Sequence, residues 1–102
     1  MSATFALQAV AADRFDLRGR IDVGNAALAL LEGQGHLGRQ PASIDLSALE
    51  SADGVTLAVL VAWAAHAARR GQALRFTGVG GRLAAIARLC AVEPLLGIAA
   101  ER

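Results

Sequence analysis

Hydrophobic and polar residues alternate along several short stretches of the chain. Residues 14–19, Arg-Phe-Asp-Leu-Arg-Gly, alternate strictly, which is typical of a half-buried antiparallel strand. The apolar run at 5–10 precedes them across a short polar turn, so the two runs are predicted to form a hairpin. The same criteria indicate further strands at 43–46 and 73–77, and a candidate short edge strand at 95–100.

Three other stretches repeat their apolar residues at the spacing of a helix. They cover residues 24–32, 54–70 and 82–91. Asp22 and Asp53 are expected to cap the first and second helices, because a carboxylate accepts hydrogen bonds from the free N–H groups at a helix start. Gly33 and Gly71 are expected to end them. The stretch 33–42 is therefore predicted to be a loop.

The predicted order of elements is strand, strand, helix, strand, helix, strand, helix. This order indicates an α/β fold, with a mixed sheet and crossover helices packed mainly on one face. A chain of 102 residues has room for one hydrophobic core, so residues 1–102 are expected to form a single domain. Its 55% hydrophobic and 19% charged residues indicate a globular protein.

Charge and cysteine content exclude several classes of function. The net charge is +1 and all ten cations are scattered arginines, so we expect no nucleic-acid partner. One cysteine and two histidines cannot form a disulfide or a structural zinc site, and no metal is expected. The N-terminus does not resemble a signal peptide, and the most hydrophobic window, 55–68, is too short to span a bilayer. We therefore expect a cytoplasmic protein that reaches a membrane only through a partner.

No set of residues indicates catalysis or a nucleotide cofactor. Residues 33–38 spell Gly-x-Gly-x-x-Gly, but they follow a predicted helix and precede a strand, the reverse of the dinucleotide-binding order. They are interpreted as a flexible connector. His36 is predicted to be a solvated loop residue, His66 an exposed helix residue, and Cys90 part of the buried face of the last helix. Since no nucleophile and base are paired, we expect no catalytic residue and no enzyme activity.

The long helix at 54–70 has two apolar sides. The predicted core side consists of Leu57, Leu60, Val61, Ala64 and Ala68. The opposite side carries Val55, Val59, Ala62, Trp63 and His66, with Thr56 near its start. An outward apolar side needs a cover. Either a neighbouring helix covers it, or it binds a protein partner with Trp63 as the anchor, and we favour the second interpretation.

Two segments of the chain resemble the central signature of STAS domains. Ile44-Asp45-Leu46-Ser47 is similar to the strand of that family that ends in Asp-Leu-Ser, and residues 52–60 resemble the following Asp-[Ser/Thr]-[Ser/Gly]-Gly-Leu helix start. Residues 69–74, 77–79 and 83–89 are similar to the family's second half. The resemblance covers nearly the whole chain, and it implies a STAS-like fold and a protein-interaction module.

Some STAS domains are anti-sigma-factor antagonists that a serine kinase phosphorylates on the hydroxyl residue after the family's Asp. Asp53 matches that Asp, but the next residue is Gly54, which has no hydroxyl. Thr56 is the nearest hydroxyl within the helix. A phosphate on Thr56 would lie near a helix N-terminus, where an anion is favoured. This branch of the family is the alternative interpretation.

The length, the last helix and the ending at 90–96 look more like another branch, the small STAS subunit of Mla-type phospholipid ABC transporters. That resemblance implies binding to the ATPase subunit, support of the assembly and activity of the complex, and a position at the inner membrane through that partner. In that branch the contact involves the helix start, here Asp53, Gly54 and Thr56. The predicted partner-binding set is therefore Asp53, Gly54, Val55, Thr56, Val59, Trp63 and His66.

Overall fold

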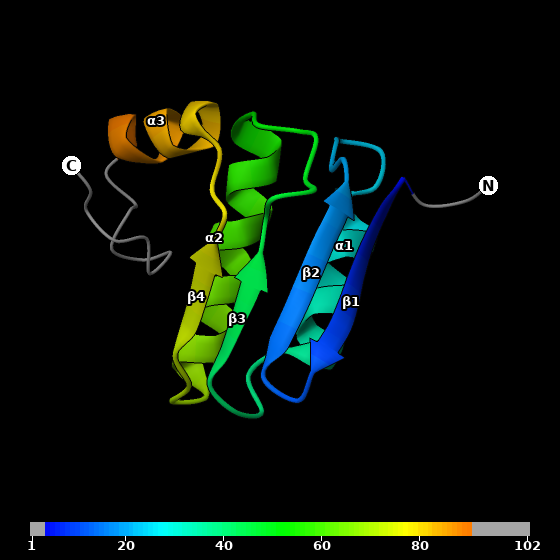
Figure 1. Cartoon of the computed structure of the whole chain (residues 1–102), viewed down its shortest axis with the longest axis vertical. Coiled ribbons are helices and arrows are strands. Elements are labelled where there is room, and N and C mark those ends of the chain that lie inside the picture. The colour runs from blue at the N-terminus through cyan, green and yellow to red at the C-terminus, as the bar shows by residue number, and fades with distance from the viewer. Residues whose placement is uncertain (1–3, 91–102) are drawn as a thin grey trace.

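A mixed β-sheet forms the framework of the protein. The computed structural model describes residues 4–90 of the chain. The strands are β1 (Phe5–Ala11), β2 (Arg14–Gly19), β3 (Ala42–Asp45) and β4 (Leu74–Thr77), and they lie in that order across the sheet (Figure 1). β1 and β2 pair antiparallel, whereas β3 is parallel to both β2 and β4. The predicted hairpin and mixed sheet are confirmed, and the candidate strand at 95–100 lies outside the described residues.

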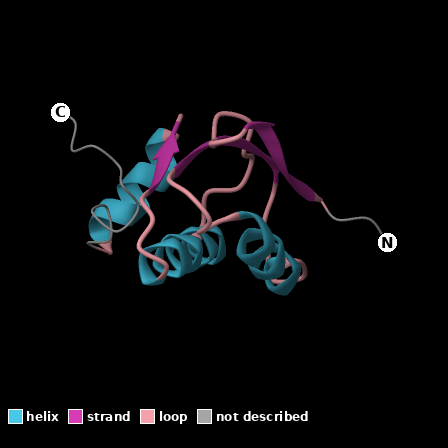
Figure 2. Ribbon diagram, turned by 90° about the horizontal axis from the view of Figure 1, so that it is seen from below, coloured by secondary structure: helices cyan, strands magenta, loops and turns pink. Residues whose placement is uncertain are grey.

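Residues 4–90 also form three helices: α1 (Ala26–His36), α2 (Gly54–Arg69) and α3 (Gly81–Leu89). α1 and α2 lie side by side against one face of the sheet (Figure 2). α3 follows β4 and contacts α2. The predicted α/β class, with helices mainly on one face, is confirmed. None of the helices within residues 4–90 is long and apolar enough to cross a membrane.

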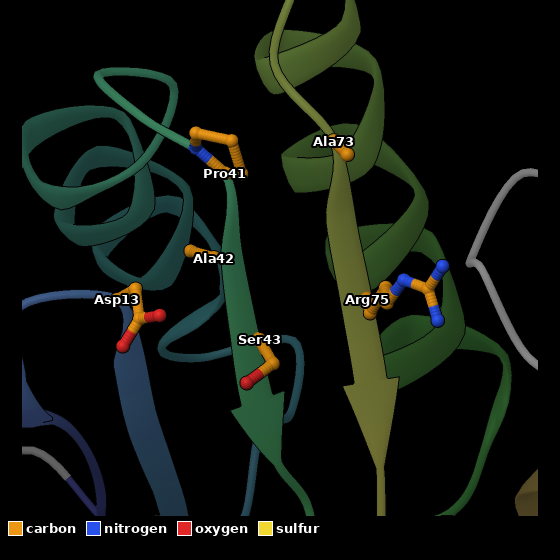
Figure 3. Close-up of a pocket in the computed structure, with 6 residues that line it drawn as sticks. All are labelled: Asp13, Pro41, Ala42, Ser43, Ala73 and Arg75. Atoms are coloured by element: carbon orange, nitrogen blue, oxygen red, sulfur yellow. The ribbon is translucent and has the colours of Figure 1, made fainter.

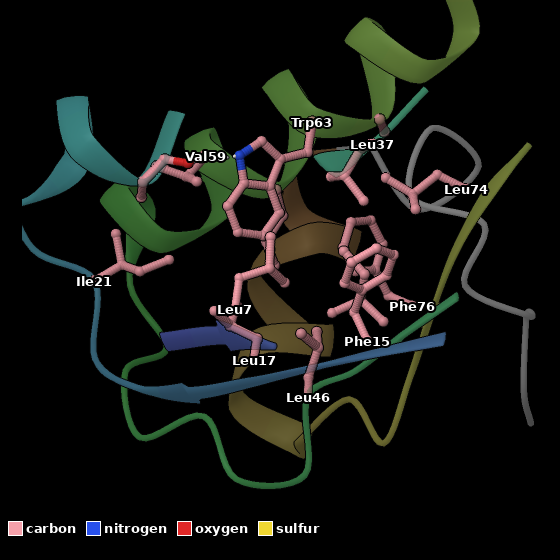
Figure 4. Close-up of a cluster of buried hydrophobic side chains, with 14 of the residues drawn as sticks. Leu7, Phe15, Leu17, Ile21, Leu37, Leu46, Val59, Trp63, Leu74 and Phe76 are labelled. Atoms are coloured by element: carbon pink, nitrogen blue, oxygen red, sulfur yellow. Dashed lines mark hydrogen bonds between the residues drawn. The ribbon is translucent and has the colours of Figure 1, made fainter. Parts of the chain in front are cut away.

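The hydrophobic core lies between the sheet and the helices α1 and α2. The inward-facing strand residues alternate with polar residues, as the sequence pattern predicts. The buried strand residues are Phe5, Leu7, Phe15, Leu17, Ile44, Leu74 and Phe76. In Figure 4 the indole of Trp63 points from α2 toward Leu7 and Leu17. On α2, Leu57, Leu60 and Ala64 are buried as predicted, whereas Ala68 is exposed.

The boundaries predicted for the first helix are wrong at both ends. Its N-cap is Asn25, because Asp22 and Asn25 instead close a turn: Asp22 N donates to Asn25 Oδ1 (2.9 Å) and Asn25 N donates to Asp22 Oδ1 (3.1 Å). The helix then continues through Gly33 and Gly35 to His36. The stretch interpreted as a flexible connector is therefore largely the last turn of a helix, where tertiary packing overrides the weak helix propensity of glycine.

The prediction that Cys90 belongs to the buried face of the last helix is also wrong. Cys90 follows the last residue of α3 and is exposed, rather than part of the buried face. That face consists of Leu83 and Ala87. Because α3 ends at Leu89, one residue earlier than the position of Cys90, the helical spacing no longer directs the cysteine toward the core.

Candidate functional site

The start of α2 is fixed by Asp53, as predicted. Asp53 is the N-cap, and its Oδ1 accepts a hydrogen bond of 2.9 Å from the Thr56 backbone N–H. This backbone bond, followed by the contribution of the Thr56 side chain, lowers the pKa of the Asp53 carboxyl below its ordinary value. Asp53 and Gly54 are both exposed, and a Cβ added at Gly54 would meet no atom within 4 Å. The helix start is therefore open to a partner.

Thr56 holds this helix start to the rest of the domain. Its side chain is fully buried. Its hydroxyl lies 2.7 Å from Ser51 Oγ and donates toward the Ile21 carbonyl oxygen at 3.3 Å, while Ile21 N donates to Ser51 Oγ at 2.9 Å. A kinase cannot reach this hydroxyl in the folded structure, so the geometry does not favour phosphorylation of Thr56. Sequence reasoning missed Ser51 and Ile21, because their contact joins residues 30 positions apart.

Val59 and Trp63 do not face solvent, so that part of the sequence interpretation is wrong. They are 2% and 1% exposed. Trp63 Nε1 donates to the Ala29 carbonyl oxygen of α1 at 3.0 Å. Gly33 lies so close to the indole that a Cβ there would be 2.0 Å from Trp63 Nε1. The covering helix is α1, which is the other interpretation considered from the sequence.

His66 also faces the protein rather than solvent. It is half-buried, and its Nε2 lies 3.2 Å from the Leu37 carbonyl oxygen. Four residues later, Arg70 Nε donates to the Gly38 carbonyl oxygen at 2.9 Å. These two side chains hold the segment that follows α1. His36 is not in a loop: it is the last residue of α1, with Nε2 3.6 Å from Glu32 Oε1.

The accessible part of the predicted partner-binding side is an apolar groove between α1 and α2. The groove has a volume of about 340 Å³, and its lining contains no charged residue. It is lined by Ala26, Leu30, Gly54, Val55, Ala58, Val59 and Ala62, and we refer to it as the α1–α2 groove. Of the predicted set, Gly54, Val55 and Val59 line it, and Asp53 lies at its end. Thr56, Trp63 and His66 support it from within the domain.

A second hollow, of about 190 Å³, lies between the starts of β3 and β4. Asp13 and Arg75 are its charged lining residues, and the side chain of Arg75 points away from Asp13 (Figure 3). Charged groups that do not converge cannot hold one ligand between them. Within residues 4–90, no cluster of three or more His, Cys, Asp or Glu side chains is placed to bind a metal ion.

The Asp-Leu-Ser segment, which begins at the last residue of β3, forms a tight turn beside the end of β4. Asp45 Oδ1 accepts hydrogen bonds from the Ser47 hydroxyl (2.6 Å) and the Ser47 N–H (2.9 Å). Both bonds lower the pKa of the Asp45 carboxyl, and the bond from the Ser47 hydroxyl has the larger effect. Gly78 has φ +64°, and a Cβ there would lie 2.3 Å from Ser47 Oγ. The Asp-Leu-Ser and Thr-Gly-Val segments singled out in the sequence therefore pack against each other.

A family model described as "Mlab, STAS domain" matches residues 6–97. The chain belongs to this MlaB-type STAS-domain family. The STAS resemblance of the two sequence segments is thereby confirmed, and so is the expectation of a non-catalytic protein-interaction domain. No curated protein matches the chain.

Proposed function

We propose that this MlaB-type STAS domain binds the ATPase subunit of a bacterial Mla-type phospholipid-transport ABC complex. In this role it supports assembly and activity of the complex, and it associates with the inner membrane on the cytoplasmic side only through that partner. The observation that carries the proposal is the accessible α1–α2 groove beside the helix start of Asp53 and Gly54, in a chain of this family.

The groove suits a protein partner with an apolar side chain at its centre. Its walls are alanine, leucine and valine, so burying an apolar group there is favourable and leaves no charge unpaired. At the open end, the Asp53 carboxylate caps the helix through Oδ1, and its exposed position lets it accept a hydrogen bond from a partner. Gly54 leaves room for the partner backbone to approach the helix start.

The buried members of the predicted set have a positioning role in this proposal. Trp63 sets the separation of α1 and α2 through its bond to Ala29, and Thr56 fixes the start of α2. His66 holds the segment after α1. Changes at these residues are therefore expected to act through the shape of the groove and through folding, whereas changes at its exposed wall act on binding alone.

A pull-down of the tagged protein from its native cell, with mass spectrometry of the co-purifying proteins, tests the proposal. Ala58→Glu places a charge on the exposed wall of the groove, and Ala85→Glu, exposed on α3, is the matched control. We expect the wild type and Ala85→Glu to recover an ABC ATPase with its permease, and Ala58→Glu to lose both. Recovery of a serine kinase instead would contradict the transporter role and support the anti-sigma-factor antagonist alternative.

A further inference from the structure

The two edges of the sheet differ in how well they are protected from pairing with another strand. β4 is short, with four residues, and carries Arg75, whose side chain points away from β3 (Figure 3). β1 has seven residues, Phe-Ala-Leu-Gln-Ala-Val-Ala, with neither a charge nor a proline. Besides β-bulges, proteins block edge pairing with charges, prolines and short edge strands. The outer edge of β1 lacks all three, and no strand within residues 4–90 covers it.

The register of the hairpin shows which backbone groups β1 directs outward. Phe5 lies opposite Gly19, so Thr4 lies opposite Arg20, and Arg20 N donates to the Thr4 carbonyl oxygen at 2.9 Å. In an antiparallel pair such hydrogen-bonded positions alternate with positions whose groups point the other way. The N–H and C=O groups of Phe5, Leu7 and Ala9 therefore face the free edge. A bulge between Ala9 and Ala11 ends this regular stretch.

These outward groups are complementary to a second copy of themselves. If two β1 strands pair antiparallel about a twofold axis at Leu7, then Leu7 exchanges both of its bonds with its symmetry mate. Phe5 likewise pairs with the Ala9 of the other copy, and Ala6 lies opposite Gln8. No like charges meet across this pairing. A twofold interface requires a self-complementary surface, and the outward groups of β1 provide one.

The helix that contacts β1 carries exposed apolar residues. α1 lies beneath β1 and β2 (Figure 1) and contacts β1. Its Ala29 and Gly33 face Trp63 of α2, while Leu28 and Leu31 lie off that contact and are 44% and 65% exposed. A strand edge alone buries less than the roughly 1,000 Å² that a specific interface needs. Adding Leu28 and Leu31 from each copy brings the interface toward that size.

We propose that the protein forms a homodimer in which the β1 strands of two copies pair antiparallel about Leu7 and their α1 helices pack through Leu28 and Leu31. The product is one continuous eight-stranded sheet with the helices of both copies on the same face. The interface is at the small end of specific contacts, so the dimer is expected to dissociate in the micromolar range. It does not use the α1–α2 groove.

Sedimentation velocity over roughly 1 µM to 1 mM, the range in which weak dimers assemble, tests this proposal. Ala9→Pro removes an outward N–H without removing a bond to β2, and Ala9→Ser, which keeps the N–H, is its control. Leu31→Glu opposes like charges across the twofold axis. Leu89→Glu, at a residue 86% exposed on α3, is the control for that change. Fluorescence of Trp63 checks that each variant is folded.

We expect a concentration-dependent monomer–dimer equilibrium in the wild type and both controls. Ala9→Pro and Leu31→Glu should each raise the dissociation constant by about tenfold or more. Amide exchange at Leu7 should slow as the wild-type concentration rises. A protein that is monomeric throughout the range, or a dimer unaffected by either folded variant, overturns the proposal. Ala58→Glu should leave the dimer intact, so failure of the ATPase proposal is distinguishable from failure of this one.

Discussion

The contact between Gly33 of α1 and Trp63 of α2 leads to a sharp prediction about stability. In a Gly33→Ala variant the new Cβ would lie 2.0 Å from Trp63 Nε1, 2.3 Å from Cδ1 and 2.5 Å from Cε2. These separations are far below van der Waals contact, so the helices or the indole must move. Trp63 is 1% exposed and bonded to the Ala29 carbonyl, and it cannot shift without losing that bond.

The change in the free energy of unfolding of Gly33→Ala is the sum of opposing contributions. Replacing a mid-helix glycine by alanine stabilises a helix by about 0.5–1 kcal/mol. Overpacking a core costs about 1–3 kcal/mol, and leaving the indole N–H without a partner costs about 1–3 kcal/mol more. Gly33→Ala should therefore lower the free energy of unfolding by roughly 1–5 kcal/mol. Gly35→Ala, in the same helix but with no atom within 4 Å of its new Cβ, should raise it by about 0.5–1 kcal/mol.

Urea unfolding followed by the fluorescence of Trp63, the one tryptophan in the chain, measures both changes. The two variants should shift the midpoint in opposite directions with similar m values, since the same surface is exposed on unfolding. A Gly33→Ala protein as stable as Gly35→Ala would refute the close packing of α1 on α2. It would also remove the reason given for the buried position of Trp63.

Three further predictions concern the helix start and its support. Thr56→Val should lower the free energy of unfolding by about 1–3 kcal/mol, because Ser51 loses a buried hydrogen-bond partner. Thermal unfolding measures this change, with Thr56→Ser, which keeps the hydroxyl, as the control. An unchanged midpoint in Thr56→Val would contradict the hydrogen bonds that join Thr56, Ser51 and Ile21. Asp53→Ala should cost about 1 kcal/mol as a lost N-cap, measured by urea unfolding, and an unchanged midpoint would argue against capping. Folding lowers the pKa of the Asp53 carboxyl from its ordinary value of 3.8. Its charge therefore adds stability above the unfolded pKa, and this stability is lost as the pH falls through the folded pKa. Asp53→Asn should reduce the decline in urea midpoint on acidification through that window, and an identical decline would contradict the assignment.

The helices and strands whose signals come from residues adjacent in the sequence could be predicted from the sequence. Strict alternation in residues 14–19 placed β2, and Asp53 ahead of an apolar helix placed the N-cap of α2, because both signals are local. The local pattern predicts a helix end at Gly33, because glycine has low helix propensity. Its actual role depends on Trp63, thirty positions away, and that contact leaves no trace in the local pattern.

For the candidate site too, local sequence signals predict one property and not another. Its position at the start of α2 followed from Asp53 and from the family resemblance. Its composition did not, because α2 is covered by the sheet on one side and by α1 on another. Periodicity alone cannot tell a side covered by a neighbouring helix from a side that faces solvent, and Val59 and Trp63 were therefore misplaced. That Ala58 forms an exposed wall of the groove follows only from the position of α1 beside α2.

The most direct test of the proposed function is an isothermal titration of the purified ATPase subunit with the wild type, Ala58→Glu and Ala85→Glu. A glutamate buried unpaired in the α1–α2 groove should cost about 2–3 kcal/mol or more, which is about a 30- to 150-fold loss of affinity or more. We predict this loss for Ala58→Glu and wild-type affinity for Ala85→Glu. Equal binding by all three proteins would contradict the groove as the ATPase site, and no binding by the folded wild type would contradict the partner itself.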